Sequence, residues 1–179
     1  MKKIETINDL EDKIVNDPEF IKGSEWGKPR NGHPEGKVKF HVIEVLDNVK
    51  KYYEDDEDYE KLRLIALIHD TFKNKVDINK PKVGENHHAM IARRFAEKYI
   101  DDINILDIIE LHDESYNSWS MGIRNSNRWD DAERRLNGLF NRLRSIYRIE
   151  LYNKFYKCDH TEGKNDDDYK WFLEKYDKI

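Results

Sequence analysis

Apolar residues along the chain recur every three or four positions, the period of helices that bury one face. The densest apolar run, LRLIALIHD, ends near Asp70. No segment sustains the alternation of a strand and no internal repeat is visible, so the sequence predicts an all-α helical bundle. A first helix, capped by Thr6 or Asn8, is expected to reach Val15. Further helices are expected over 38–53, up to Asp70, over 85–99, 102–113 and 130–158, and around Tyr169, Trp171, Phe172 and Tyr176. Loops or connectors are expected at 22–37, 71–83 and 115–127.

The length and composition narrow the class of protein. A chain of 179 residues with 12% aromatic residues fits one ordered domain. Its net charge of −5 argues against general binding of nucleic acid or of an anionic membrane, so phosphate binding needs a local patch. The single cysteine, Cys158, excludes an internal disulfide. The chain starts without an apolar leader and has no apolar stretch of membrane-spanning length, so we expect a cytoplasmic protein.

Histidine and aspartate side chains interrupt five otherwise apolar helix faces. His69, His112 and Asp159 each follow apolar residues at the offsets of one and two helical turns. His41 lies within such a face, and His88 begins one. These positions point into the protein. Taken singly, an inward histidine is more often a hydrogen-bonded core residue than a ligand.

Asp70 is harder to explain as a core residue. It follows six mostly apolar residues at the expected end of a helix, where the helix dipole disfavours an anion. A buried carboxylate there needs a cation, and a metal shared with nearby histidines supplies one. Mixed imidazole and carboxylate ligands suit Mn, Fe, Co, Ni or Zn better than Ca.

The order of these residues resembles the HD superfamily of metal-dependent phosphohydrolases. Lys73 completes the motif HDxxK, and HPEGKVKFHVIEVLD (33–47) resembles the segment that opens the HD domains of certain tRNA nucleotidyltransferases and their stand-alone relatives. HHAMIARRF (87–95) resembles the family's histidine-led helix. The likeness covers about residues 33–160 and implies one HD-type domain over 1–179, with helices at both ends packing on it. The matching residues are, in order, His41, His69, Asp70, His88, His112 and Asp159.

The resemblance also implies one or two divalent transition metal ions at the centre of the bundle. By the family pattern, His41, His69, Asp70 and Asp159 hold the first ion. His88 and His112 add a second ion, with Asp70 shared between the two. A metal makes water a nucleophile near neutral pH. Asp70 can orient that water, and Lys73, one helical turn further on, can pair with a phosphate oxygen.

Three features depart from the family pattern. Thr71 and Phe72 stand where an aliphatic residue and a glycine are frequent, which predicts a narrower entrance. Asp113 stands where some dinuclear members have a second histidine, and it is either a ligand or an acceptor behind one. His87 precedes His88, and we prefer His88 as the ligand because it heads the apolar stripe.

Five further residues are candidates for substrate binding, each with a structural alternative. His33 lies in an expected loop and is either a substrate contact or plain surface. Arg135 and Arg142 belong to a row spaced by seven residues, which either grips phosphate or forms a solvated flank paired with acids. Tyr116 and Trp119 can stack on a base or fix their loop to the core.

The first functional hypothesis is a phosphohydrolase acting on a nucleotide or a related small phosphoester. The HPEG segment favours phosphomonoesters or 2′,3′-cyclic phosphodiesters as substrates. The same ligand order is shared with mixed-valent diiron oxygenases, which form the alternative. A catalytically silent binding module is the third hypothesis, and the intact ligand set argues against it. Nucleic acid is not expected as a partner, and a homodimer is left open.

Overall fold

The computed structural model describes residues 3–29, 36–160 and 166–178. The described residues form helices joined by turns and contain no strand, which confirms the all-α prediction. The α-helices are α1 (Asp9–Val15), α2 (Pro18–Ser24), α3 (Val38–Tyr53), α4 (Tyr59–Ile68), α5 (His88–Ala96), α6 (Ile103–Leu111), α7 (Glu114–Arg124), α8 (Trp129–Leu143), α9 (Ile146–Asp159) and α10 (Asp167–Tyr176), and short 3₁₀ turns cover Lys73–Lys75, Gly84–Asn86 and Ser126–Arg128.

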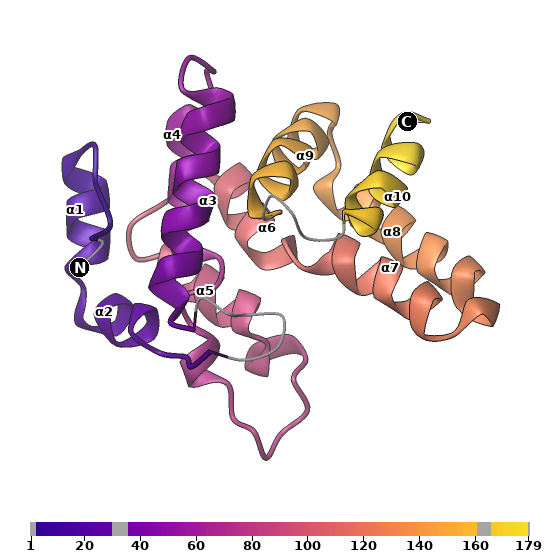
Figure 1. Ribbon diagram of the computed structural model, residues 1–179, viewed down its shortest axis with the longest axis horizontal. Coiled ribbons are helices and arrows are strands. Elements are labelled where there is room, and N and C mark those ends of the chain that lie inside the picture. Colours follow the sequence, from indigo (N-terminus) through magenta and orange to yellow (C-terminus); the bar gives the residue numbers. More distant parts are fainter. Residues whose placement is uncertain (1–2, 30–35, 161–165, 179) are drawn as a thin grey trace.

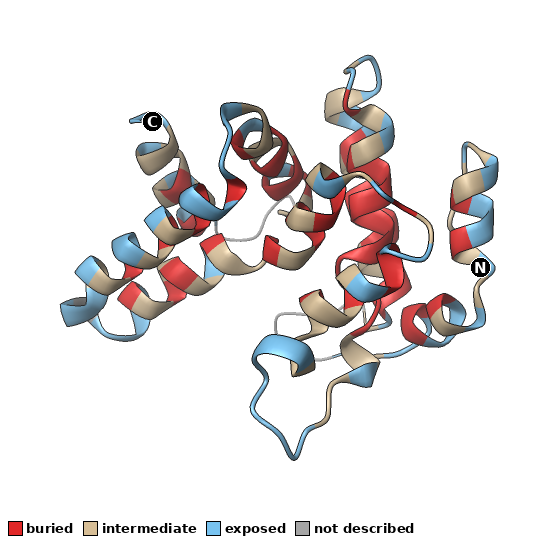
Figure 2. Ribbon diagram, turned by 180° about the vertical axis from the view of Figure 1, so that it is seen from behind, coloured by how far each residue is buried: buried red, intermediate tan, exposed pale blue. Residues whose placement is uncertain are grey.

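Helix α4 is the central element of the bundle. Every residue from Leu62 to Ile68 is buried, and Figure 2 shows this helix buried along most of its length. It contacts α3, α6 and α9. Figure 1 places α1 and α2 on one side of the α3–α4 pair and the α7, α8 and α10 group on the other. Because α4 is enclosed on several sides, the residues that follow its last turn emerge inside the protein.

Two short N-terminal helices brace this centre. Asn8 caps α1 by accepting from the Glu11 backbone N–H at 2.9 Å, as expected for one of the two candidate caps. The buried carboxylate of Glu11 accepts two hydrogen bonds of 2.8 Å from Arg63 of α4. This paired contact ties the N-terminal segment to the central helix.

The loop predicted over 22–37 is wrong at its start, because α2 continues to Ser24. Asp17 caps that helix and Pro18 occupies its first turn, which favours helix despite the nearby glycine. Gly23 packs directly on the backbone carbonyl of Thr71, and a Cβ at this position would overlap that oxygen. The glycine therefore allows α2 to support the turn after Asp70.

The predicted polar loop over 115–127 is also wrong, because Glu114–Arg124 is helix α7. Its polar residues are small and form the buried face: Ser118 donates its hydroxyl to the Glu114 carbonyl oxygen at 2.7 Å. A Cβ on Gly122 would overlap the ring of Trp129 in α8. Small residues here permit close helix packing, and they give no period of large apolar residues from which a helix could be predicted.

The single helix predicted over 130–158 is interrupted. Helix α8 ends at Leu143, and Arg144 adopts a left-handed backbone conformation with φ of 62°. Ser145 then caps α9 by accepting from the Arg148 backbone N–H at 3.2 Å. A capping serine after an arginine was the only local signal of this break.

The helix expected over 38–53 is present with those bounds as α3, whereas the helices expected over 85–99 and 102–113 are shorter. Helix α5 begins at His88 and ends at Ala96, inside the expected 85–99. Helix α6, Ile103–Leu111, lies inside 102–113. A 3₁₀ turn follows Asp70 within the expected connector.

Candidate functional site

The ends of two helices present histidines in the same way. His69 follows the last residue of α4 and donates its Nδ1–H to the Ala66 carbonyl oxygen at 3.0 Å. His112 follows α6 and donates its Nδ1–H to the Ile109 carbonyl oxygen at 2.8 Å. Because a carbonyl oxygen only accepts, these bonds leave Nε2 of each neutral ring with a lone pair for a ligand. Both rings are buried.

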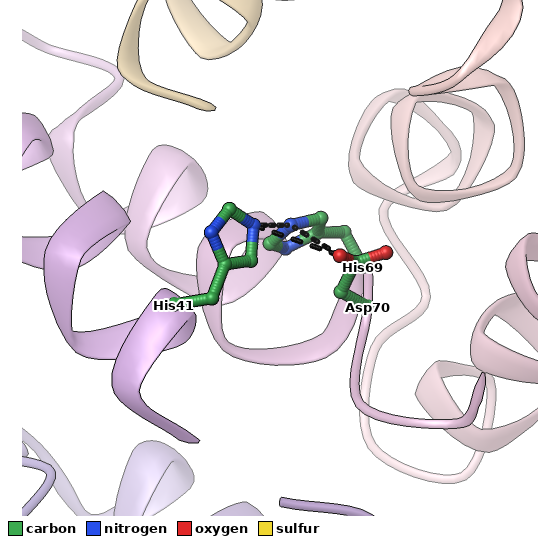
Figure 3. Close-up of side chains that lie close together, drawn as sticks. All are labelled: His41, His69 and Asp70. Atoms are coloured by element: carbon green, nitrogen blue, oxygen red, sulfur yellow. Dashed lines mark hydrogen bonds and ion pairs between the residues drawn. The ribbon is translucent and has the colours of Figure 1, made fainter. Parts of the chain in front are cut away.

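Four atoms from helices α3 and α9 and from the turn after α4 meet in what we call the first half-site: Nε2 of His41 and His69, Oδ1 of Asp159 and Oδ2 of Asp70. His41 Nε2 lies 3.2 Å from His69 Nε2 and 3.0 Å from Asp159 Oδ1. Asp70 Oδ2 lies 3.6 Å from His41 Nε2 and 3.9 Å from His69 Nε2. Figure 3 shows the His41 and His69 rings directed toward the Asp70 carboxylate.

The second half-site consists of Nε2 of His88 and His112, the carboxylate of Asp113 and Oδ1 of Asp70. The two Nε2 atoms lie 3.3 Å apart, and they lie 3.3 and 3.4 Å from Asp70 Oδ1. Asp113 Oδ2 lies 3.0 Å from His88 Nε2, and its Oδ1 lies 3.4 Å from His112 Nε2. Asp70 thus turns one carboxylate oxygen to each half-site.

One oxygen of the cluster lacks a partner. Asp159 Oδ1 is buried and makes no hydrogen bond of acceptable geometry among the described residues, although His41 Nε2 and His69 Nε2 lie 3.0 and 3.3 Å away. A buried carboxylate oxygen without a donor is costly unless a cation neutralises it. Together with neighbouring imidazole nitrogens, it forms a donor set that suits a divalent transition metal. The residues present therefore fit a metal ion.

Charged neighbours shift the pKa values of the cluster residues in the direction opposite to the shift caused by burial. Burial alone raises the pKa of Asp70, but the charges of Lys73 and His69 hold it well below its usual range. Burial likewise acts to raise the pKa of Asp159, and the charge of His69 keeps it low. For His112, burial lowers the pKa, but the charge of Asp113 and the contact with Asp70 outweigh it and raise the pKa to about 9.

The two neighbouring histidines at the start of α5 differ in their contacts. His87 is the N-terminal cap of α5, and its Nδ1 accepts from the Ala89 backbone N–H at 3.3 Å. The neutral ring of His87 then carries its proton on Nε2, which lies 3.9 Å from Asp113 Oδ2. His88 Nε2 lies closer to both Asp113 and Asp70. This geometry favours His88 as the ligand of the pair.

A cavity of about 520 Å³ opens onto the first half-site, and its lining includes His41, Asp70 and Lys73. Lys73 Nζ contacts the Oδ2 atom of Asp70. Burial lowers the pKa of Lys73, but the charge of Asp70 outweighs it and raises the pKa, so the ammonium stays charged at neutral pH. Lys73 therefore places a fixed positive charge between the cavity and the cluster.

Sequence reasoning missed the other wall of this cavity. Glu25, Trp26 and Lys28 line it from the segment after α2, and the Trp26 side chain is partly exposed. Glu25 accepts from Lys37 at 2.6 Å, which joins this segment to the start of α3. A large aromatic residue within a polar, glycine-rich stretch was the available signal.

The candidate substrate-binding residues lie elsewhere in the described structure or outside it. Arg135 donates two hydrogen bonds of 2.9 and 3.0 Å to Glu114, and Arg142 contacts Glu110. Tyr116 and Trp119 lie on α7 with ring centres 6.0 Å apart. His33 falls outside the described residues. The four described candidates are not part of the lining of the cavity at the first half-site.

A family model for the HD domain matches residues 38–145, more than half of the chain. The matched segment contains the helices that carry His41, His69, His88 and His112 and ends before Asp159. Comparison with curated proteins and with solved structures gave no match. Among the described residues, no helix combines the length and apolar character needed to cross a membrane.

Proposed function

The chain belongs to the HD domain family, and from this premise we propose that it is a metal-dependent phosphohydrolase of a nucleotide or a related small phosphoester. The observation that carries the proposal is the position of Asp70, which offers one carboxylate oxygen to each of two histidine groups beside a cavity. A silent binding module needs no such shared carboxylate. We infer that the cluster serves catalysis.

In this proposal the two half-sites hold one ion each. A divalent transition metal supplies Lewis acidity for a phosphoryl oxygen and lowers the pKa of water. Its ligands in the first half-site are His41, His69, Asp70 and Asp159, and in the second half-site His88 and His112 with Asp70, while Asp113 is a further carboxylate within reach.

The chain's own residues account for orientation and charge. Asp70 is fixed by the turn after α4 and accepts a hydrogen bond from an attacking water, which orients its lone pair toward phosphorus. Lys73 then moves its ammonium from Asp70 to a phosphate oxygen, where it offsets the charge that develops during attack. The products are an alcohol and a phosphate group, with the water proton passing to the leaving oxygen.

The cavity supports a small substrate. Trp26 offers an apolar ring opposite the cluster, and Lys28 a further cation. A nucleoside phosphate matches this combination, with its phosphate near Lys73 and its base or sugar against the tryptophan. Gly27, Pro29 and Gly36 belong to the same lining and contribute little side-chain bulk to it.

The test is a substrate screen with wild type and two lysine variants. Nucleoside mono-, di- and triphosphates, 2′,3′-cyclic nucleotides and dinucleoside polyphosphates are assayed with Mn²⁺, Co²⁺, Ni²⁺ and Fe²⁺. Lys73→Ala retains its metal but loses about 30- to 150-fold in rate, because one charge-assisted contact is worth about 2–3 kcal/mol. Lys75→Ala, the control, removes a lysine that pairs with Glu19 and leaves the rate unchanged.

The second candidate function is a mixed-valent diiron oxygenase. It is favoured by the same shared carboxylate, because two histidine groups that each face one oxygen of Asp70 would also suit a pair of iron ions. Protein purified without oxygen and loaded with Fe²⁺ distinguishes the two. Hydrolysis of a phosphoester without oxygen consumption supports the phosphohydrolase. Oxygen consumption with no phosphoester hydrolysed under any metal supports the oxygenase.

A further inference from the structure

A second hollow, of about 500 Å³, lies where the α8–α9 corner meets α6. Three arginines, one serine and one carboxylate provide its polar lining, and none of its lining residues belongs to the cavity at the first half-site. The hollow is therefore separate from the proposed active site. Its polar lining residues are Asp107, Arg142, Arg144, Ser145 and Arg148.

The one carboxylate of the lining is already neutralised. Asp107 accepts from Arg148 at one oxygen and from Arg93 at the other, both at 2.8 Å. Arg148 is further fixed by donating to Asn104 Oδ1 at 2.8 Å. These bonds hold the Arg148 guanidinium at the wall of the hollow, so its position is set before any ligand arrives.

Arg142 is likewise held by a carboxylate, that of Glu110. It contacts one oxygen of Glu110, and the other oxygen of Glu110 accepts from Arg93 at 2.6 Å. Arg93 thus forms ion pairs with both Asp107 and Glu110, and it also pairs with Glu97. The group thus contains four arginines and three carboxylates, which leaves one net positive charge beside the hollow. The arginines are Arg93, Arg142, Arg144 and Arg148, and the carboxylates are Glu97, Asp107 and Glu110.

Arg144 is the residue that the fold does not explain. Its φ of 62° is in the left-handed region that favours glycine, at the position after a helix where glycine is usual. Its exposed side chain makes no ion pair or hydrogen bond with the residues that the structure describes. An arginine kept in a strained backbone conformation without a protein partner suggests a role in binding.

We propose that this hollow binds a small phosphate-bearing anion through Arg142, Arg144 and Arg148. Guanidinium groups present paired donors that match phosphate oxygens, and three of them line this one hollow. The Ser145 hydroxyl accepts from the Arg148 backbone N–H, which leaves its own hydrogen to donate to the anion. Ile103, partly exposed at the edge, leaves an apolar flank for the remainder of the ligand. The site does not depend on the proposed hydrolase activity.

The experiment titrates inorganic phosphate into ¹⁵N-labelled protein loaded with Zn²⁺ and follows the amide signals of residues 142–148. These signals shift saturably in wild type, and signals near Lys73 report separately on phosphate at the metal cluster. In Arg144→Gly the midpoint at the hollow rises at least about tenfold, because one charge-assisted contact is lost. The melting temperature of Arg144→Gly is equal to or higher than that of wild type, since glycine adopts this backbone conformation without strain.

Two further variants make the result specific. Arg134 is an exposed residue of α8, the helix that carries Arg142, and it pairs with Asp131. In Arg134→Ala the midpoint of the phosphate titration stays within about twofold of wild type. Arg142→Gln weakens phosphate at the hollow without changing the Arg144 backbone. The inference is overturned by unsaturable shifts in wild type, by an unchanged midpoint in Arg144→Gly, or by equal weakening in Arg134→Ala. A clear loss of stability in Arg144→Gly also overturns it, because the arginine would then hold the corner itself.

Discussion

The two half-sites share Asp70 and use the same histidine geometry, yet they differ in how well they are satisfied without a metal. In the first half-site Asp159 Oδ1 is buried with no hydrogen bond among the described residues. In the second, the Asp113 carboxylate is more exposed and contacts both histidines at 3.0 and 3.4 Å. A cation in the first half-site would satisfy this buried oxygen, whereas solvent already reaches part of the Asp113 carboxylate in the second half-site. We expect the first to bind its ion more tightly.

The largest expected effect comes from removing Asp70, the residue that the two half-sites share. Asp70→Ala takes one carboxylate oxygen from each, so both ions bind more than about 100-fold more weakly, because even residues behind the ligands contribute 10- to 100-fold. Elemental analysis after dialysis gives the metal content. Asp130→Ala, on the exposed first turn of α8, is the control and keeps both ions. Two ions per chain in Asp70→Ala would show that the half-sites do not depend on a shared carboxylate.

The next effect separates the half-sites. Asp159→Asn and Asp113→Asn each keep the side-chain shape but remove one charge. Asp159→Asn weakens binding of the tighter ion by about 100-fold, because its buried oxygen makes no hydrogen bond among the described residues. Asp113→Asn lowers the affinity for the weaker ion alone, by about tenfold. Calorimetric titration of Mn²⁺ into the metal-free variants measures both. The comparison fails if Asp113→Asn removes the tighter ion.

The inward-facing histidine and aspartate side chains were predictable because they depend on local geometry. His69, His112 and Asp159 continue apolar helix faces, and a helix face points in one direction whatever surrounds it. The structure brings them together with His41 and His88, as the order of residues suggested. Their role as ligands stays a prediction.

Features that depend on contact between distant segments were not predictable in this way. Helix α7 was missed because its buried face is made of serines and Gly122, which fit closely against Trp129 and give no apolar period. The wall around Trp26 depends on how the chain after α2 approaches α3. The break at Arg144 depends on a backbone angle that an arginine rarely adopts. The sharing of Asp70 between two histidine groups was implied by the family resemblance and not by the helix faces.

A smaller effect tests what holds the second half-site in place. The Tyr152 hydroxyl donates to the His112 carbonyl oxygen at 2.9 Å and accepts from the Ser115 backbone N–H at 3.2 Å. It therefore fixes the corner between α6 and α7. Tyr152→Phe weakens the second ion about 10- to 100-fold, leaves the first unchanged and lowers the free energy of unfolding by about 1–2 kcal/mol.

The matched control for this change is Tyr169→Phe. Its hydroxyl donates to Asn153 Oδ1 at 3.0 Å, away from the α6–α7 corner. Tyr169→Phe loses this one hydrogen bond and some stability, measured by urea unfolding, with no change in either metal affinity. Equal effects of Tyr152→Phe on both ions would contradict a role confined to the second half-site.

The last effect, which amounts to about tenfold in affinity for a single pH unit, concerns proton competition at His112. In the metal-free protein its pKa is raised from 6.5 to about 9. This protonated histidine stabilises the metal-free fold below about pH 6.5, and that stability is lost as pH rises through 9. Metal binding requires the neutral ring, so the affinity of the second ion rises with pH over the same window and levels off above 9. The difference in melting temperature between metal-loaded and metal-free protein should therefore widen from pH 6.5 to 9. A difference that is constant or narrows over this range would mean that His112 does not exchange its proton for a metal.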